Sequence, residues 1–163
     1  MRHCGYNKRC VVIATNSGTG QEWWSPYLLA EIAEINIKEG QADDALRILD
    51  EAIDVTVRRG EVWNKGELYR RKGEIILQSG GDPSSAAVER EVEACFEKAL
   101  EIAKDHSAKS WQLRAAKSLA RLWQQQGKQT EARELLAEIY NWFTEGFDTK
   151  DLQEAKVLLE ELG

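Results

Sequence analysis

Residues 111–143 read WQLRAAKSLARLWQQQGKQTEARELLAEIYNWF, and a single glycine divides this stretch into two helical patterns. On each side of that glycine, apolar residues recur at the spacing of one helical face: Leu119, Ala120 and Trp123, then Ala132, Leu136, Ile139 and Tyr140. Gly127 is expected to end the first helix, because only glycine takes the left-handed cap conformation at little cost. The stretch therefore predicts two helices that fold back on each other.

The same unit occurs twice earlier in the chain. In each copy a tryptophan precedes a glycine at almost the same distance: Trp24 and Gly40, Trp63 and Gly80, Trp111 and Gly127. A small residue lies near the middle of each first helix: Ala33, Gly73 and Ala120. Small side chains let two helices approach closely, whereas larger ones would wedge them apart. The sequence therefore predicts three repeats, at about 24–59, 61–106 and 108–143.

This spacing resembles that of tetratricopeptide repeats, in which apolar and small residues hold fixed positions on two helices. The matching first-helix positions are Leu29, Ile32 and Ala33; Tyr69, Lys72 and Gly73; and Ala116, Leu119 and Ala120. The chain departs from the motif because Lys72 stands where an apolar residue is expected, the repeats are longer, and the late proline is missing. The alternative is an unrelated helical bundle in which the spacing is accidental.

The expected fold is all-α, with three tetratricopeptide-like helix hairpins in a right-handed superhelical array plus a C-terminal capping helix. Residues 1–21 are expected to form a flexible or loosely docked leader, and residues 22–163 the repeat domain. The predicted helices span about 26–39, 42–59, 61–79, 85–105, 108–126 and 130–143, with the cap at about 149–162. Asp148 is expected to cap that last helix. Its apolar stripe would cover the open end of the array: Leu152, Ala155, Leu158, Leu159 and Leu162.

Several segments look like the C-terminal tetratricopeptide region of bacterial predicted ATPases: residues 20–27, 67–74, 99–103, 113–123 and 142–149. In that family the region often follows an adenylate or guanylate cyclase domain or a winged-helix DNA-binding domain. The resemblance covers about residues 20–162 and does not include the ATPase and cyclase domains, so it implies no nucleotide chemistry. It implies a sensing or scaffolding region of a bacterial signalling or regulatory system, as a short stand-alone chain or as a fragment of a larger protein.

Composition narrows the classes of partner. The chain of 163 residues contains only 2 prolines and carries a net charge of -6. A negative charge argues against nonspecific nucleic-acid binding, which depends on surplus cations that displace counterions from phosphate. No apolar run approaches the ~18 to 20 residues that a membrane helix requires. We therefore expect a cytoplasmic protein with neither a nucleic-acid nor a membrane partner.

The sequence shows no enzyme signature, and no cofactor or metal site is expected. His3, Cys4 and Cys10 have no second cluster that would complete a tetrahedral metal site. Residues 17–20 superficially resemble a phosphate-binding loop, but Gln and Glu follow where Lys and Ser or Thr must meet phosphate and magnesium. Cys95 lies next to an apolar helix position, so we expect a reduced, buried thiol.

In tetratricopeptide arrays the first helix of each repeat lines a concave surface. Counted from the three small residues, the predicted peptide-binding groove contains Tyr27, Glu34 and Lys38; Arg70, Arg71 and Glu74; and Arg114, Lys117, Arg121 and Gln125. Basic residues gather in the second and third repeats, and guanidinium groups bind carboxylates in bidentate geometry. The alternative is that Glu67 and Glu74 neutralise these arginines along the helix, which would give only weak surface pairs.

The expected function is therefore a non-catalytic protein- or peptide-binding scaffold. The partner would present an acidic segment or a free C-terminal carboxylate. The alternative is a ligand-responsive regulatory domain that binds a small acidic molecule or a signalling peptide. A homodimer through the first repeat is also expected, because an apolar end remains uncovered there unless the leader folds over it: Trp23, Trp24, Tyr27 and Leu28.

Overall fold

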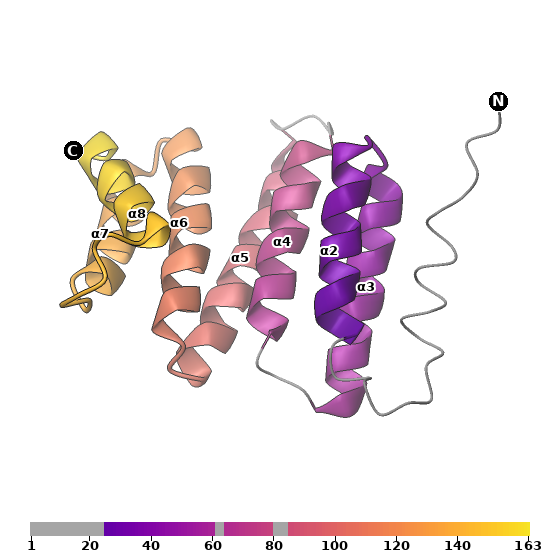
Figure 1. Cartoon of the computed structure of the whole chain (residues 1–163). Coiled ribbons are helices and arrows are strands. Elements are labelled where there is room, and N and C mark those ends of the chain that lie inside the picture. Colours follow the sequence, from indigo (N-terminus) through magenta and orange to yellow (C-terminus); the bar gives the residue numbers. More distant parts are fainter. Residues whose placement is uncertain (1–24, 61–63, 80–84) are drawn as a thin grey trace.

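The structure, a computed structural model, describes residues 25–60, 64–79 and 85–163. Within these ranges the chain forms helices and turns without a strand, which confirms the all-α prediction. The helices are α2 (Ser25–Lys38), α3 (Ala42–Arg59), α4 (Lys65–Gln78), α5 (Ala86–Asp105), α6 (Lys109–Gln125), α7 (Gln129–Tyr140) and α8 (Lys150–Glu161). From right to left in Figure 1 the chain passes from α2 and α3 through α4 and α5 to α6, α7 and α8. The predicted leader lies outside the described residues.

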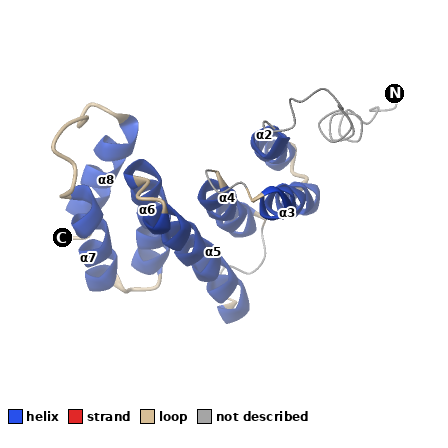
Figure 2. Ribbon diagram, turned by 90° about the horizontal axis from the view of Figure 1, so that it is seen from below, coloured by secondary structure: helices blue, strands red, loops and turns tan. Residues whose placement is uncertain are grey.

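Consecutive helices pack against each other and form the pairs α2–α3, α4–α5 and α6–α7. The first helices of the pairs also touch: α2 contacts α4, and α4 contacts α6. Figure 2 shows α2, α4 and α6 on one side of the molecule, with α3, α5 and α7 on the other. α8 packs on both α6 and α7, so it stands where the first helix of a further pair would stand.

Glycines end helices where the sequence places them. Gly40, Gly60 and Gly127 have φ angles of 77°, 66° and 78°, in the left-handed region. The prediction for Gly127 is therefore confirmed. Gly80, which ends the corresponding helix of the second repeat in the prediction, lies outside the described residues. At Gly60 the backbone N–H donates to the carbonyl of Thr56, so the cap also satisfies the end of α3.

Buried apolar side chains form three groups along the array. The first lies among α2, α3 and α4, the second among α4, α5 and α6, and the third among α5 to α8. Half-buried side chains connect them: Leu46 packs on the first and second, Tyr69 on the first and third, and Trp123 on the second and third. The predicted stripe of α8 belongs to the third group, as Leu152 and Ala155 illustrate.

One of the three small residues predicted at the hairpin contacts, Gly73, lies where two helices approach closely. A Cβ atom placed on Gly73 of α4 would lie 2.6 Å from Cε1 of Phe96 on α5, too close for any side chain without a shift. Ala33 and Ala120, the equivalent residues in α2 and α6, are fully buried. The close contact expected from the sequence is therefore confirmed for Gly73.

One local expectation, at the start of α8, differs from the structure. Asp148 does not cap α8. Thr149 precedes the helix, and its hydroxyl donates to the carbonyl of Gly146 at 2.7 Å, so no side chain caps the first turn. Lys72, which replaces an apolar residue of the motif, pairs with Asp50 of α3 at 2.6 Å. An ion pair between α3 and α4 thus occupies the place of an apolar contact. None of the described helices combines the length and apolar character needed to cross a membrane.

Candidate functional site

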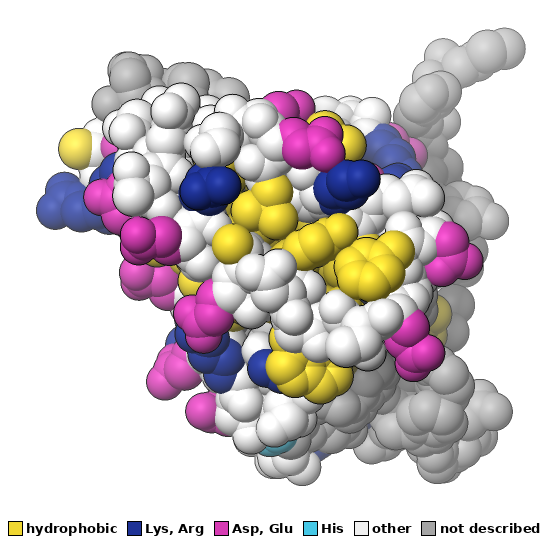
Figure 3. All heavy atoms as spheres, turned by 90° about the vertical axis from the view of Figure 1, so that its left-hand side faces the viewer, with side chains coloured by type: hydrophobic (Ala, Val, Ile, Leu, Met, Phe, Trp, Pro, Cys, Tyr) yellow, Lys and Arg dark blue, Asp and Glu magenta, His cyan; other side chains and the backbone are white. Residues whose placement is uncertain are grey.

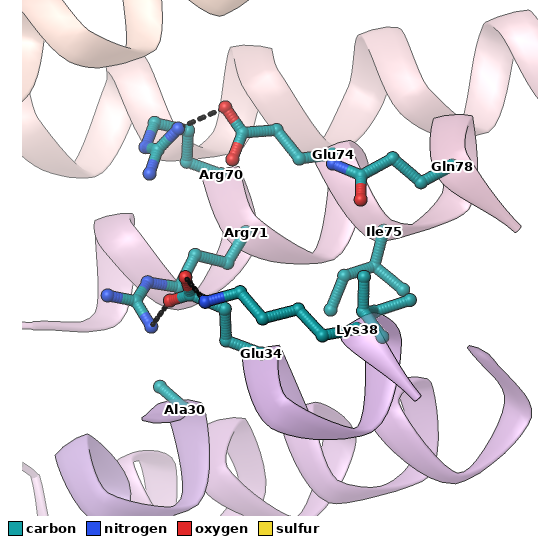
Figure 4. Close-up of a pocket in the computed structure, with 9 residues that line it drawn as sticks. Ala30, Glu34, Lys38, Arg70, Arg71, Glu74, Ile75 and Gln78 are labelled. Atoms are coloured by element: carbon teal, nitrogen blue, oxygen red, sulfur yellow. Dashed lines mark hydrogen bonds and ion pairs between the residues drawn. The ribbon is translucent and has the colours of Figure 1, made fainter. Parts of the chain in front are cut away.

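The side formed by α2, α4, α6 and α8 carries two hollows of about 330 Å³ each. The first lies between α2 and α4 and is lined by Ala30, Glu34, Ile37, Lys38, Arg70, Arg71, Glu74, Ile75 and Gln78 (Figure 4). The second lies among α4, α6 and the start of α8 and is lined by Arg70, Glu74, Arg114, Lys117, Ser118, Arg121, Lys150, Asp151 and Glu154. Because Arg70 and Glu74 line both, the hollows adjoin on one surface, which we call the groove face.

The structure brings most of the predicted groove residues together. The residues that line one or both hollows are Glu34, Lys38, Arg70, Arg71, Glu74, Arg114, Lys117 and Arg121. Gln125 is exposed in the last turn of α6 and lines neither hollow. Tyr27 belongs to α2, but its side chain lies outside the described part of the chain. That these residues bind a peptide stays a prediction.

Arg71 connects α4 to α2 at the first hollow. Its guanidinium lies 2.9 Å from Glu31 and 3.4 Å from Glu34, both on α2, and 3.4 Å from Glu67 on its own helix. Burial acts to lower the pKa of Arg71, but the hydrogen bond to Glu31 and the nearby carboxylates raise it. Lys38 pairs with Glu34 at 3.2 Å and remains largely exposed. The rim of the first hollow is therefore ionic.

The floor of the first hollow is apolar. Ala30 and Ile75 are buried and Ile37 is half-buried. Figure 4 shows the side chains of Arg71 and Lys38 directed toward Glu34. An apolar floor with a few charged groups at its edge is the usual composition of a ligand pocket.

Arg70 lies where the two hollows meet. Its guanidinium donates to both carboxylate oxygens of Glu67, at 2.8 and 2.7 Å, and also binds Glu74. Burial acts to raise the pKa of Glu67, but the hydrogen bond and charge of Arg70, with further arginines, lower it below its ordinary value. The hydroxyl of Ser118 on α6 donates to Glu74 at 3.1 Å, which joins α4 to α6. Arg70 is therefore neutralised by Glu67 and Glu74 of its own helix, as the alternative to a carboxylate-binding role predicts.

The second hollow contains a buried cation. The Lys117 side chain is 6% exposed, and its ammonium donates to Asp151 at 2.7 Å and to Glu154 at 2.9 Å, both on α8. Nε of Arg114 donates to the other oxygen of Asp151 at 2.6 Å. The sequence placed Lys117 on an open surface, and this differs because α8 lies across the groove side of α6. Lys117 therefore holds two helices together.

The two α8 carboxylates remain ionised at neutral pH. Burial acts to raise the pKa of Asp151, but hydrogen bonds from Lys117 and Arg114 lower it below its ordinary value. The pKa of Glu154 is lowered chiefly by its hydrogen bond from Lys117. The sequence pattern predicts α8 only as a capping helix, so it does not identify Asp151 and Glu154 as residues of the groove face. The signal that points to them is that α8 follows three helix pairs and so takes the place of the first helix of a fourth pair, whose groove side would carry Asp151 and Glu154.

Two basic residues of the second hollow form fewer or weaker ion pairs than Lys117 does. Arg121 is exposed and forms no ion pair with any residue that the structure describes. Lys150 is 89% exposed and lies 3.7 Å from Glu154. Exposed pairs at such distances contribute little stability. These cations are therefore available to an anionic partner at low energetic cost.

Apolar side chains also gather on the end of the molecule formed by α7, α8 and their connection (Figure 3). Trp142, Phe147 and Val157 are about half exposed there. The ring of Phe147 lies 5.8 Å from that of Tyr140, and the ammonium of Lys109 lies 5.3 Å from the centre of the Trp142 ring. At the opposite end Leu28 and Ile35 of α2 are exposed. The expected homodimer through the first repeat stays a prediction, and Trp23 and Trp24 lie outside the described residues.

Two further kinds of chemistry to consider on the described residues are a metal site and a reactive thiol. The described ranges contain no group of three or more His, Cys, Asp and Glu side chains placed to hold a metal ion. Cys95 is a free, buried thiol, as expected, and burial raises its pKa. His3, Cys4 and Cys10 lie outside the described residues.

No protein-family model matches this chain, and no curated protein matches it with significant similarity.

Proposed function

We propose that the chain is a non-catalytic scaffold that binds a protein or peptide along the groove face. In this proposal its helix pairs follow the tetratricopeptide arrangement, a right-handed superhelix. The observation that carries the proposal is the pair of adjoining hollows, one with an apolar floor and one with exposed cations. An extended peptide can place an apolar side chain in the first and a charged group in the second. The cytoplasmic location and the bacterial signalling role rest on composition and sequence resemblance.

The partner proposed is an acidic segment or a free C-terminal carboxylate. Arg121 and Lys150 at the second hollow and Lys38 at the first are the exposed cations of the groove face. Carboxylates bind such groups through charge-assisted hydrogen bonds. The affinity should be modest and should fall with added salt, because exposed charges are screened over ~8 to 10 Å at moderate ionic strength.

The test compares the parent with the double variant Arg121→Glu and Lys150→Glu in selection from a random peptide display library. The parent should enrich acidic peptides, and the variant should not. Lys117 is unsuitable for this reversal, because it is buried against α8 and its loss would disturb the fold. The matched control is Lys156→Glu with Arg133→Glu, which changes charge equally at exposed positions outside both hollows. Equal enrichment by the parent and the groove variant, with unchanged helical circular dichroism, would contradict the proposal.

The second candidate is a regulatory domain that binds a small acidic molecule. Its support is the size of the hollows, since about 330 Å³ is within the range of small-molecule sites. Thermal unfolding in the presence of a set of small carboxylates and phosphates separates the candidates. A small ligand that binds only the native state raises the midpoint. If acidic peptides raise the midpoint and small acids do not, the scaffold proposal is favoured.

A further inference from the structure

The second hollow already contains carboxylates supplied by the chain itself. Asp151 and Glu154 of α8 bind Lys117, and Asp151 also binds Arg114. Both cations belong to the set that the sequence predicts for recognition of a partner's carboxylate. The contacts are charge-assisted hydrogen bonds of 2.6 to 2.9 Å, which is the geometry a bound acidic peptide would use. A partner must therefore compete with α8 for positive charge.

The α8 helix as a whole is not free to leave. Leu152, Ala155 and Leu158 are almost completely buried against α6 and α7. Moving α8 away would expose all of this apolar surface to water, which is unfavourable. Asp151 is correspondingly fixed, because its two oxygens are held by two different cations and it lies in the first turn of the helix. Competition has to occur at a side chain that can move while α8 stays in place.

Glu154 meets that requirement. Its side chain is 36% exposed at the edge of the hollow, and it contacts Lys117 at 2.9 Å and Lys150 at 3.7 Å. Arg121 also acts on it electrostatically. If Glu154 turns to solvent, Lys117 keeps its bond to Asp151 and is not left as an unpaired buried charge. Glu74, the other carboxylate of the hollow, is held by Arg70 and Ser118 and lacks this freedom.

We propose that Glu154 is a built-in competitor for the second hollow, occupying the position of a partner's carboxylate and thereby setting the affinity for acidic partners. The inference rests on the proposed function of the groove face. An acidic side chain of the partner would replace Glu154 near Lys150, Arg121 and the outer side of Lys117. A neutral residue at position 154 would leave these cations with less compensation and would strengthen binding of any acidic ligand.

The experiment uses a fluorescein-labelled polyglutamate peptide and measures fluorescence anisotropy with the full chain at about 0.1 M salt, where charges are screened over ~10 Å. Glu154→Gln should bind the peptide about three- to tenfold more tightly than the parent, the size expected for removing one like charge close to the ligand. The matched control is Glu160→Gln, which removes the same charge from the same helix, at an exposed position that lines neither hollow. The control should change affinity by less than about twofold, because its charge is distant and screened.

The possible results distinguish failure of the competitor role of Glu154 from failure of the proposed function of the groove face. If Glu154→Gln and Glu160→Gln tighten binding equally, only net charge matters and the competitor role is wrong. If Arg121→Glu weakens binding while Glu154→Gln has no effect, the groove face binds acids and the inference alone fails. If Arg121→Glu has no effect on binding in the parent or in the Glu154→Gln background, both the competitor role and the proposed function are wrong. The same conclusion follows if no variant binds the peptide. Circular dichroism and thermal unfolding of each variant verify that the fold is retained.

Discussion

The contact between α4 and α5 and the contact between α6 and α8 on the groove face are built from opposite kinds of side chain. At the first, Gly73 brings α4 so close to Phe96 that even a methyl group would overlap the ring. At the second, Lys117 and Arg114 hold Asp151 through hydrogen-bonded ion pairs. Both contacts join neighbouring helices, but they differ in whether solvent or a ligand can take the place of one of the contacting side chains.

Apolar contact fixes the distance between helices because its atoms are in van der Waals contact and no solvent group can substitute for them. The exposed charges around the ionic contact can be satisfied by water, salt or the charge of a ligand, whereas the buried Lys117 needs its partners on α8. The separation of the helices in a pair is therefore set by the apolar contacts. At its exposed charges, such as Glu154 and Lys150, the groove face can exchange partners without loss of the fold.

The largest expected effect concerns the apolar contact. Gly73→Leu should lower the free energy of unfolding by about 3 kcal/mol, because the new side chain must displace Phe96 or separate α4 from α5. Urea unfolding followed by circular dichroism measures the change. Ala87→Leu, at an exposed position in the first turn of α5, is the control and should have little effect. An unchanged midpoint for Gly73→Leu would show that the two helices can separate freely.

A smaller effect is expected at the ionic contact. Lys117→Met should cost about 2 kcal/mol, because two carboxylates lose their buried partner. The cost is less than for a fully buried pair, since water reaches Asp151 and Glu154 in part. The same urea experiment measures it. Lys150→Met removes an exposed lysine near the same Glu154 and should change stability little. Similar losses for the two lysine variants would mean that burial of Lys117 has no energetic consequence.

The smallest effect is a dependence on pH. The folded pKa values of Asp151 and Glu154 lie below their ordinary values of 3.8 and 4.5, so their contribution to stability is complete above about pH 5. It is lost as the pH falls through the lowered folded values. Asp151→Asn should therefore be less stable than the parent by about 1 kcal/mol at pH 7, and the difference should shrink toward pH 2. Thermal unfolding across this range measures it. A difference that grows on acidification would contradict the ion-pair account.

The sequence could predict the residues whose role depends on their own backbone and the residues that recur at the same place in each repeat. Gly127 ends α6 because only its own backbone conformation is involved, and the small residue Gly73 could be recognised because small residues stand at the same place in the other two predicted repeats. The periodicity that defines helices and buried faces is likewise local, so the all-α fold and the apolar stripe of α8 could be predicted. Capping of α8 was predicted wrongly, because the hydroxyl of Thr149 bonds back to Gly146 and the sequence does not show which of two neighbouring polar residues precedes the helix.

The candidate site could be predicted only in part. Helical spacing correctly places Arg114, Lys117 and Arg121 on one side of α6, toward the second hollow. It does not show that α8 crosses that side, because the crossing depends on how α8 packs on both α6 and α7. The burial of Lys117 and the carboxylates of Asp151 and Glu154 were consequently missed.

The helices of the array differ in how many neighbours support them, because α4 and α6 pack on more of the described helices than α2 or α8 does. α4, α5 and α6 are flanked on both sides, whereas α2 and α8 each end the described array. In a linear arrangement of this kind, an end element can open without disturbing elements beyond its nearest neighbours. Backbone amides should accordingly exchange with solvent slowly in α4, α5 and α6, because each of these helices packs between described neighbours on both sides. Leu46, Tyr69 and Trp123, each of which packs on two groups, are among the side chains through which a local opening in one group would affect another.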